Sequence, residues 1–149
     1  MGALSYLVGY DGRQLGIGMS CYQNALGGRV VVLGYGPWQR LGSTAKRSQI
    51  VATADWVARG HLPVIIEQTL RVSPWLRMSA DGRKLALVLL NASLDSSGDI
   101  TLRLRAQPAD LRLLTLSGMQ PLTWQQKGSD VLVSIPDIGP WQTATIVSA

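Results

Sequence analysis

A regular series of short strand-like segments fills the second half of the chain and most limits what the chain can fold into. Eight such segments follow one another after residue 62, separated by short stretches rich in Gly, Pro, Asp and Ser. In two of them apolar residues occupy every second position (Ile100, Leu102 and Leu104; Val131, Val133 and Ile135). This alternation is typical of strands with one buried face and one wet face. Short strands at this spacing predict an antiparallel β-sandwich over residues 62–149.

The first part of the chain has a different pattern, with eleven of the 16 glycines within residues 1–60. Two apolar runs, Leu4–Tyr10 and Leu15–Gln23, flank Asp11-Gly12, which predicts a β-hairpin. After a second turn at Asn24–Gly28, the β-branched run Arg29–Tyr35 predicts a strand buried on both faces.

A helix is predicted from about Thr44 to Arg59, with Ser43 or Thr44 as its N-cap. An apolar stripe at helical spacing would face the core (Ile50, Val51, Ala54, Val57 and Ala58). Gly60 is expected as the C-cap, with Arg59 in the last turn. The predicted fold is therefore mainly β: an antiparallel β-sandwich with an N-terminal hairpin, one buried strand and one α-helix packed on it. The expected division is a partial α/β segment, 1–61, and a sandwich domain, 62–149.

Composition excludes several classes of protein. Apolar residues make up 46% of the 149 and charged residues 15%, which argues against disorder. The net charge is +5, but the cations are scattered, and we expect no nucleic-acid partner. No apolar run reaches membrane-spanning length. The N-terminus has no basic n-region, so it does not resemble a signal peptide, which favours a cytoplasmic location without fixing the compartment.

The stretch Gly34-Tyr35-Gly36-Pro37, between a strand and a helix, invites comparison with a phosphate-binding loop. The dinucleotide fingerprint needs a third glycine where this chain has Gln39. Pro37 has no N–H to donate. We therefore expect a structural corner here and no cofactor.

Catalytic chemistry has few candidate residues. His61, Cys21 and Glu67 are each the only residue of their type. A Ser-His-Asp or Cys-His site would need His61, which directly follows the expected helix end. A glycosidase pair would have to join Glu67 to an aspartate, and most of the aspartates fall at predicted turns. Metal ligands are too few for a site. We predict no catalytic, cofactor-binding or metal-binding residue.

The five tryptophans bear on a third kind of site, a stacking platform for sugar rings. Trp56 is expected in the core. Trp75 and Trp141 each follow a proline at a strand start, and we expect their side chains to be buried at the ends of the sandwich core. Trp124 is interpreted as an exposed aromatic side chain. The candidate contacts to a partner or a sugar are then Tyr35, Trp38, Arg40 and Trp124.

The order of the segments "NALGGRVVVLGYGPW", "STAKRSQIVATADWVARGHLPV", "RKLALVLLNAS" and "PDIGPWQTATIVS" resembles the C-terminal end of bacterial glycoside hydrolases of the family 42 β-galactosidase type. That resemblance implies the end of an amidotransferase-like α/β domain used in trimerisation, followed by a small antiparallel β domain. The family's two catalytic glutamates lie in a barrel that this chain does not include, so the resemblance transfers no catalytic residue.

These observations favour a non-catalytic accessory or assembly domain of a carbohydrate-active protein, and no enzyme activity of its own. Its expected partner is a missing upstream domain or a second copy of the chain. The alternative is a carbohydrate-binding module using exposed aromatics. A free-standing enzyme, the third class, would need a deep pocket holding His61 or paired carboxyls.

Overall fold

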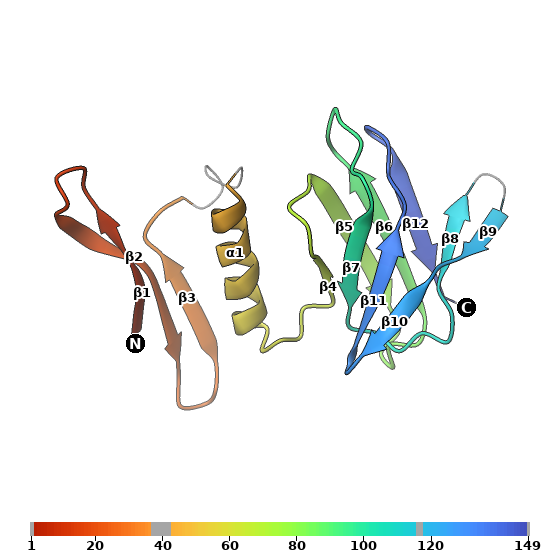
Figure 1. Ribbon diagram of the computed structural model, residues 1–149. Helices are drawn as coiled ribbons and strands as arrows, with labels where there is room; N and C mark the ends of the chain where they lie inside the picture. Colours follow the sequence, from red (N-terminus) through yellow and green to blue (C-terminus); the bar gives the residue numbers. More distant parts are fainter. Residues whose placement is uncertain (1, 37–42, 116–117, 149) are drawn as a thin grey trace. The chain divides into compact units, whose positions relative to one another are not determined.

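The computed structural model describes residues 2–36, 43–115 and 118–148, and it divides into two compact units, Met1–His61 and Leu62–Ala149 (Figure 1). The first unit holds β1 (Gly2–Val8), β2 (Gln14–Gln23), β3 (Arg29–Leu33) and α1 (Thr44–Val57). The second holds β4 (Val64–Ile66), β5 (Val72–Met78), β6 (Leu85–Asn91), β7 (Ile100–Leu104), β8 (Arg112–Thr115), β9 (Gly118–Pro121), β10 (Trp124–Lys127), β11 (Asp130–Ile135) and β12 (Thr143–Val147). The predicted mainly β, antiparallel fold is confirmed.

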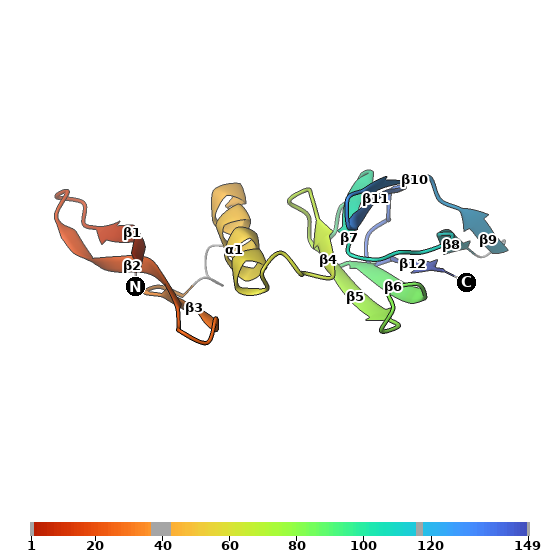
Figure 2. The ribbon, with the colours of Figure 1, turned by 90° about the horizontal axis from the view of Figure 1, so that it is seen from below.

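Two antiparallel sheets form the second unit. One has the strand order β10-β11-β7-β4 and the other the order β5-β6-β12-β8-β9. Figure 2 shows them as two layers. The alternating residues of β7 and β11 face the same way because Leu102 pairs with Val133 and Leu104 with Val131. The predicted inward face of these two strands is confirmed, since all six of its residues are buried.

The core between the sheets belongs to this unit alone. It includes Leu87 and Leu89 of β6, Leu102 of β7, Val131 of β11 and Ile146 of β12. Burying an aliphatic side chain of this size stabilises a fold by about 1.5–3 kcal/mol. The second unit therefore has the closed apolar core that a sandwich needs.

A buried amide, Asn91 at the end of β6, fastens the segment that crosses from β11 to β12. Its side chain is 1% exposed, and its Nδ2 donates to the carbonyls of Ile138 (2.8 Å), Gly139 (3.1 Å) and Asp95 (2.8 Å). Its Oδ1 accepts from the Ser93 N–H, and its own N–H donates to the Gln142 carbonyl. Asn91-Ala92-Ser93 has the form of a glycosylation sequon. The folded chain uses this amide internally.

We predict that Asn91→Ala lowers the free energy of unfolding by about 2–4 kcal/mol, because several buried backbone groups lose their partner at once. Urea titration followed by circular dichroism measures this loss. The control is Gln126→Ala, which removes an exposed amide that donates to the Gly128 carbonyl at 2.8 Å. It should cost no more than about 0.5 kcal/mol. Equal losses for the two variants would contradict the role given to Asn91.

The first unit is a three-stranded antiparallel sheet, β1-β2-β3. The expected hairpin is present: Gly12 turns with φ 80°, and Asp11 Oδ1 accepts from the Arg13 N–H at 3.0 Å. At the second turn Asn24 Oδ1 accepts from the Gly28 N–H at 2.7 Å. Helix α1 contacts β3. No helix of the described residues is long and apolar enough to cross a membrane.

The helix ends earlier than expected. Ala58 is the C-cap, where we expected Gly60, and both Arg59 (φ 58°) and Gly60 (φ 73°) follow in the left-handed region. The Gly60 N–H donates to the Asp55 carbonyl and the Arg59 N–H to the Trp56 carbonyl, which is a Schellman motif. The Arg59 guanidinium donates to the Gly27 carbonyl, tying this helix end to the β2–β3 turn. At the other end Ser43 is the N-cap residue, without a side-chain hydrogen bond.

Candidate functional site

Of the four residues predicted to contact a partner or a sugar, Tyr35 lies in the first unit and Trp124 in the second. Tyr35 is engaged within the first unit: its hydroxyl donates to Gln49 Oε1 at 3.0 Å, and Lys46 Nζ lies 4.5 Å from its ring centroid. Trp124 was expected to be exposed, but it is half-buried and packs against the sandwich core. Trp38 and Arg40 lie outside the described residues.

The glycine corner serves strand packing. The Gly34 N–H donates to the Gly18 carbonyl at 2.9 Å. A Cβ at Gly34 would lie 2.3 Å from the Ile17 carbonyl oxygen, so only glycine lets β3 leave the sheet this close to β2. This contact gives Gly34 a structural role, as the sequence analysis expected.

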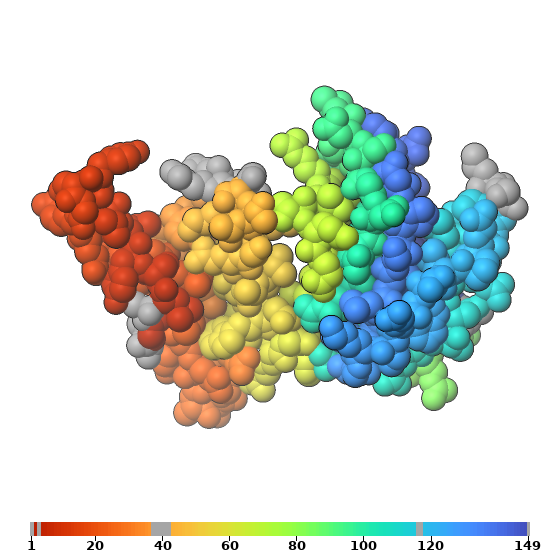
Figure 3. All heavy atoms as spheres, viewed as in Figure 1, coloured from red at the N-terminus to blue at the C-terminus, as the bar shows by residue number. Residues whose placement is uncertain are grey.

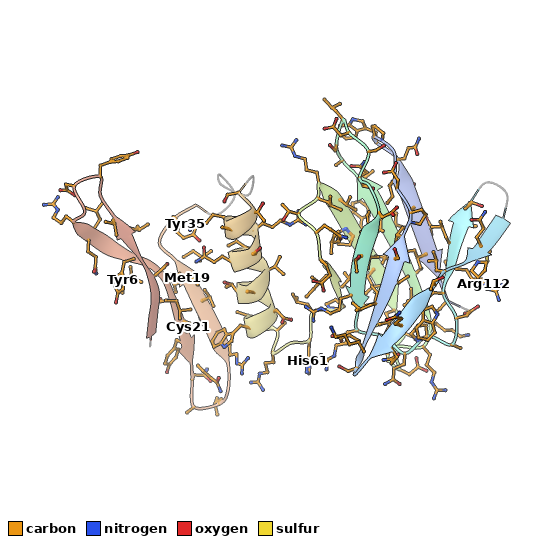
Figure 4. All side chains as sticks on the ribbon, viewed as in Figure 1. Tyr6, Met19, Cys21, Tyr35, His61 and Arg112 are labelled. Atoms are coloured by element: carbon orange, nitrogen blue, oxygen red, sulfur yellow. The ribbon has the colours of Figure 1, made fainter. Side chains whose placement is uncertain are left out.

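Helix α1 packs on the sheet with a face that the sequence analysis did not predict. Gln49, Thr53 and Trp56 face β2, where Gln49 Nε2 and Thr53 Oγ1 lie 3.7 and 3.5 Å from Met19 Sδ. Figure 4 shows Met19 and Cys21 on the strand that faces this side of the helix. These helix positions share one side at 3.6 residues per turn, and the predicted stripe through Ile50, Ala54 and Val57 lies on another.

The contact between helix and sheet is loosely filled. A hollow of about 300 Å³ remains between them, lined among others by Leu4, Cys21, Val31 and Trp56. At its edge Arg29 lies over the Trp56 ring, 4.8 Å from the centroid, and donates to the Trp56 carbonyl at 2.7 Å. The side of the helix that packs on the sheet therefore carries polar side chains, and the predicted apolar stripe is not part of this contact.

The opposite face of the same sheet is open. Val30 pairs with Tyr22 and Val32 with Ser20, so their side chains lie on the face away from the helix. Val30 and Val32 are each 52% exposed and Tyr22 is 47% exposed. The prediction that this strand is buried on both faces is therefore wrong for the described chain, which covers one face only. An exposed row of β-branched and aromatic side chains is a candidate protein interface.

Glu67 and Asp130 are joined through one arginine on the outer face of the sheet formed by β10, β11, β7 and β4. Arg103 Nε lies 3.1 Å from Glu67 Oε1, and its Nη1 lies 3.4 Å from Asp130 Oδ2. Figure 3 shows the side of the second unit on which these strands lie. Burial lowers the pKa of Arg103, but its hydrogen bonds and ion pairs with Glu67 and Asp130 outweigh burial and raise that pKa. The arrangement is an ion-pair network, with the cation shared by both carboxylates.

We predict that Arg103→Met lowers the free energy of unfolding by about 0.5–1 kcal/mol, because the network is partly exposed. The loss should shrink at high salt, which screens partly exposed charges. Arg77→Met, at an exposed arginine on β5, is the control. Urea titrations at low and high salt measure both variants. A loss above about 2 kcal/mol that does not depend on salt would contradict this reading.

The described residues contain no group of three His, Cys, Asp or Glu side chains that could hold a metal ion. His61 is exposed, and its N–H donates to the Ala58 carbonyl at 3.0 Å. Asp81, like Asp11, accepts hydrogen bonds within its own turn, from Ser79 Oγ and the Arg83 N–H, and these lower its pKa.

Two tryptophans predicted to be buried are exposed instead. Trp75 is 67% exposed because it pairs with Val88, whose side chain points away from the core. Trp141 is 64% exposed and lies in the turn before β12, at the edge of a hollow in the sandwich. The dipeptide Pro140-Trp141 was a usable signal for a turn, since proline favours its second position.

No protein-family model matches the sequence, and no curated protein matches it. Among solved structures, the chain is similar to alpha-L-fucosidase isoenzyme 2 from Paenibacillus thiaminolyticus, with a TM-score of 0.60 and 14% sequence identity. The match covers 91% of this chain and 22% of the fucosidase chain. At this identity the likeness shows a fold shared with part of a glycosidase, and nothing about activity.

Proposed function

We propose that this chain is a non-catalytic accessory or assembly part of a glycosidase-like protein of the family 42 β-galactosidase type. The fold likeness to about a fifth of a fucosidase chain supports the broader statement. The order of segments from Asn24 to Ser148 supports the finer one. The resemblance implies that catalysis resides in a barrel outside these residues. In agreement with that, Glu67, the only glutamate, is held by Arg103.

One observation carries the assembly role: the helix and sheet of the first unit both have apolar residues that they do not bury against each other. Val30, Val32 and Tyr22 lie on the sheet face away from α1. Ile50 and Val57 lie on a side of α1 other than the one facing β2. A layer with apolar residues on both outer sides is typical of α/β proteins in which further layers cover it.

The occupant of the open sheet face is either an upstream domain or a second copy of the chain. In a solution of the purified chain only a second copy is present, so we expect self-association through Val30, Val32 and Tyr22. Burying a valine in such a contact contributes about 1.5–3 kcal/mol. A carboxylate in the same place would have to be desolvated without a partner.

Val32→Asp should therefore weaken self-association at least about tenfold, since 1.4 kcal/mol corresponds to a factor of ten. Sedimentation equilibrium over a wide range of protein concentrations measures the association constant. The control is Gln125→Asp, which places the same charge at an exposed position of edge strand β10.

We expect Gln125→Asp to associate like the unmodified chain, and all three proteins to show the same urea unfolding of the sandwich. An unmodified chain that stays monomeric at every concentration would contradict self-association through this sheet face. So would equal weakening by both substitutions, because it would reflect added charge rather than the sheet face.

A further inference from the structure

A hollow of about 860 Å³ lies on the second unit where β8 and β12 meet the segment leading into β12. Its lining includes Leu114, Asp137, Trp141, Gln142 and Thr143. None of its lining residues is used above for the assembly role.

Trp141 occupies a backbone position that favours glycine. The Gln142 N–H donates to the Gly139 carbonyl at 3.2 Å, which closes a turn with Pro140 second and Trp141 third. The φ of Trp141 is 56°, and a positive φ at the third position is the feature of a type II turn that glycine or asparagine ordinarily supplies. The backbone of Trp141 is therefore strained. Its side chain is 64% exposed, so core packing does not offset this strain. Strain of this kind gathers at binding sites.

Hydrogen bonds of Asn91 and Asp137 hold the turn that carries Trp141 in place. Asn91 Nδ2 donates to the carbonyls of Ile138 and Gly139, and the Asn91 N–H donates to the Gln142 carbonyl. Asp137 Oδ1 accepts from the Gly98 N–H at 2.7 Å and from Ser97 Oγ at 3.3 Å. The indole is therefore presented by a fixed backbone, which lowers the entropy cost of binding a ligand.

The groups around the indole define the kind of ligand. The exposed Gln142 side chain lies over Gly139, where an added Cβ would come within 2.9 Å of its Oε1. The Gln142 amide and the Thr143 hydroxyl form no side-chain hydrogen bond among the described residues, and both are exposed. The described lining has one carboxylate, Asp137, and neither lysine nor arginine, so an anionic ligand would be repelled.

From this geometry we propose that the hollow beside Trp141 binds a neutral oligosaccharide. The apolar C–H face of a sugar ring packs on the indole, as apolar surfaces do on aromatic faces. Hydroxyls of the sugar pair with the Gln142 amide, the Thr143 hydroxyl and the Asp137 carboxylate. The lining of the hollow mixes apolar residues such as Leu114 with these polar groups, and convergent polar groups of this kind orient a ligand in small-molecule sites.

Titration of the full chain with β-1,4-galactotetraose, cellotetraose and xylotetraose tests the proposal, with calorimetry and tryptophan fluorescence as readouts. We expect saturable binding of at least one of them, with a Kd of roughly 0.1–1 mM. A galacturonate tetramer of equal length should bind at least about tenfold more weakly, because each of its sugars carries a carboxylate.

Trp141→Gly separates a binding role from a packing role. We expect it to weaken oligosaccharide binding at least about tenfold and to leave Tm unchanged or raise it by roughly 2–5 °C, because strain is released. Trp75→Ala is the matched control, since Trp75 is equally exposed but does not line the hollow. It should bind the sugar like the unmodified chain.

Three results would overturn the proposal. The first is no saturable binding of any neutral tetramer. The second is unchanged affinity in Trp141→Gly, or an equal loss in Trp75→Ala. The third is a lower Tm in Trp141→Gly, which would assign the indole to packing. If Trp141→Gly instead changes self-association and the sugars do not bind, the hollow is a contact between copies.

Discussion

The amide of Asn91 closes one end of the sandwich, and the second unit depends on it. The segment after β11 has to cross from one sheet to the other before β12 begins, and such a crossing leaves backbone carbonyls without strand partners. Asn91 supplies donors to two of them from the end of β6, inside the core. The segment that carries Trp141 is thereby fixed to the end of β6 by one buried side chain.

The described residues of the first unit form no equivalent centre. Its helix rests on the sheet through Gln49, Thr53 and Trp56, with a hollow left between them. Its apolar side chains are spread over surfaces that the unit does not cover itself. One chain thus combines a closed sandwich with a layer whose described apolar side chains are exposed, and the proposed assembly role rests on that difference.

Periodicity in the sequence predicted the closed part well. Ile100, Leu102 and Leu104 alternate in a strand with one buried face, and the pattern alone identified that face. Turn chemistry was equally informative at Asp11-Gly12, where only local backbone preferences matter. Periodicity failed for the helix, because it locates an apolar stripe without saying which neighbour exists to receive it. The β-branched run at β3 failed for the same reason.

The tryptophans were harder to predict because their placement depends on register between distant segments. Trp75 is exposed through its pairing with Val88, and Trp141 through the φ of a turn. The dipeptide Pro140-Trp141 indicates the turn but not this φ, and the pairing of Trp75 has no local signal. The hollow beside Trp141 joins β8, β12 and the preceding loop, so its residues could not be grouped before the sheet order was known.

Hydrogen exchange of the full chain at low and high protein concentration tests the assembly role most directly. If the sheet of the first unit self-associates, amides of β1, β2 and β3 become more protected as protein concentration rises. The protection of amides in β6, β7, β11 and β12 stays the same. Protection of β1–β3 that equals that of the sandwich, and is the same at every concentration, would contradict it.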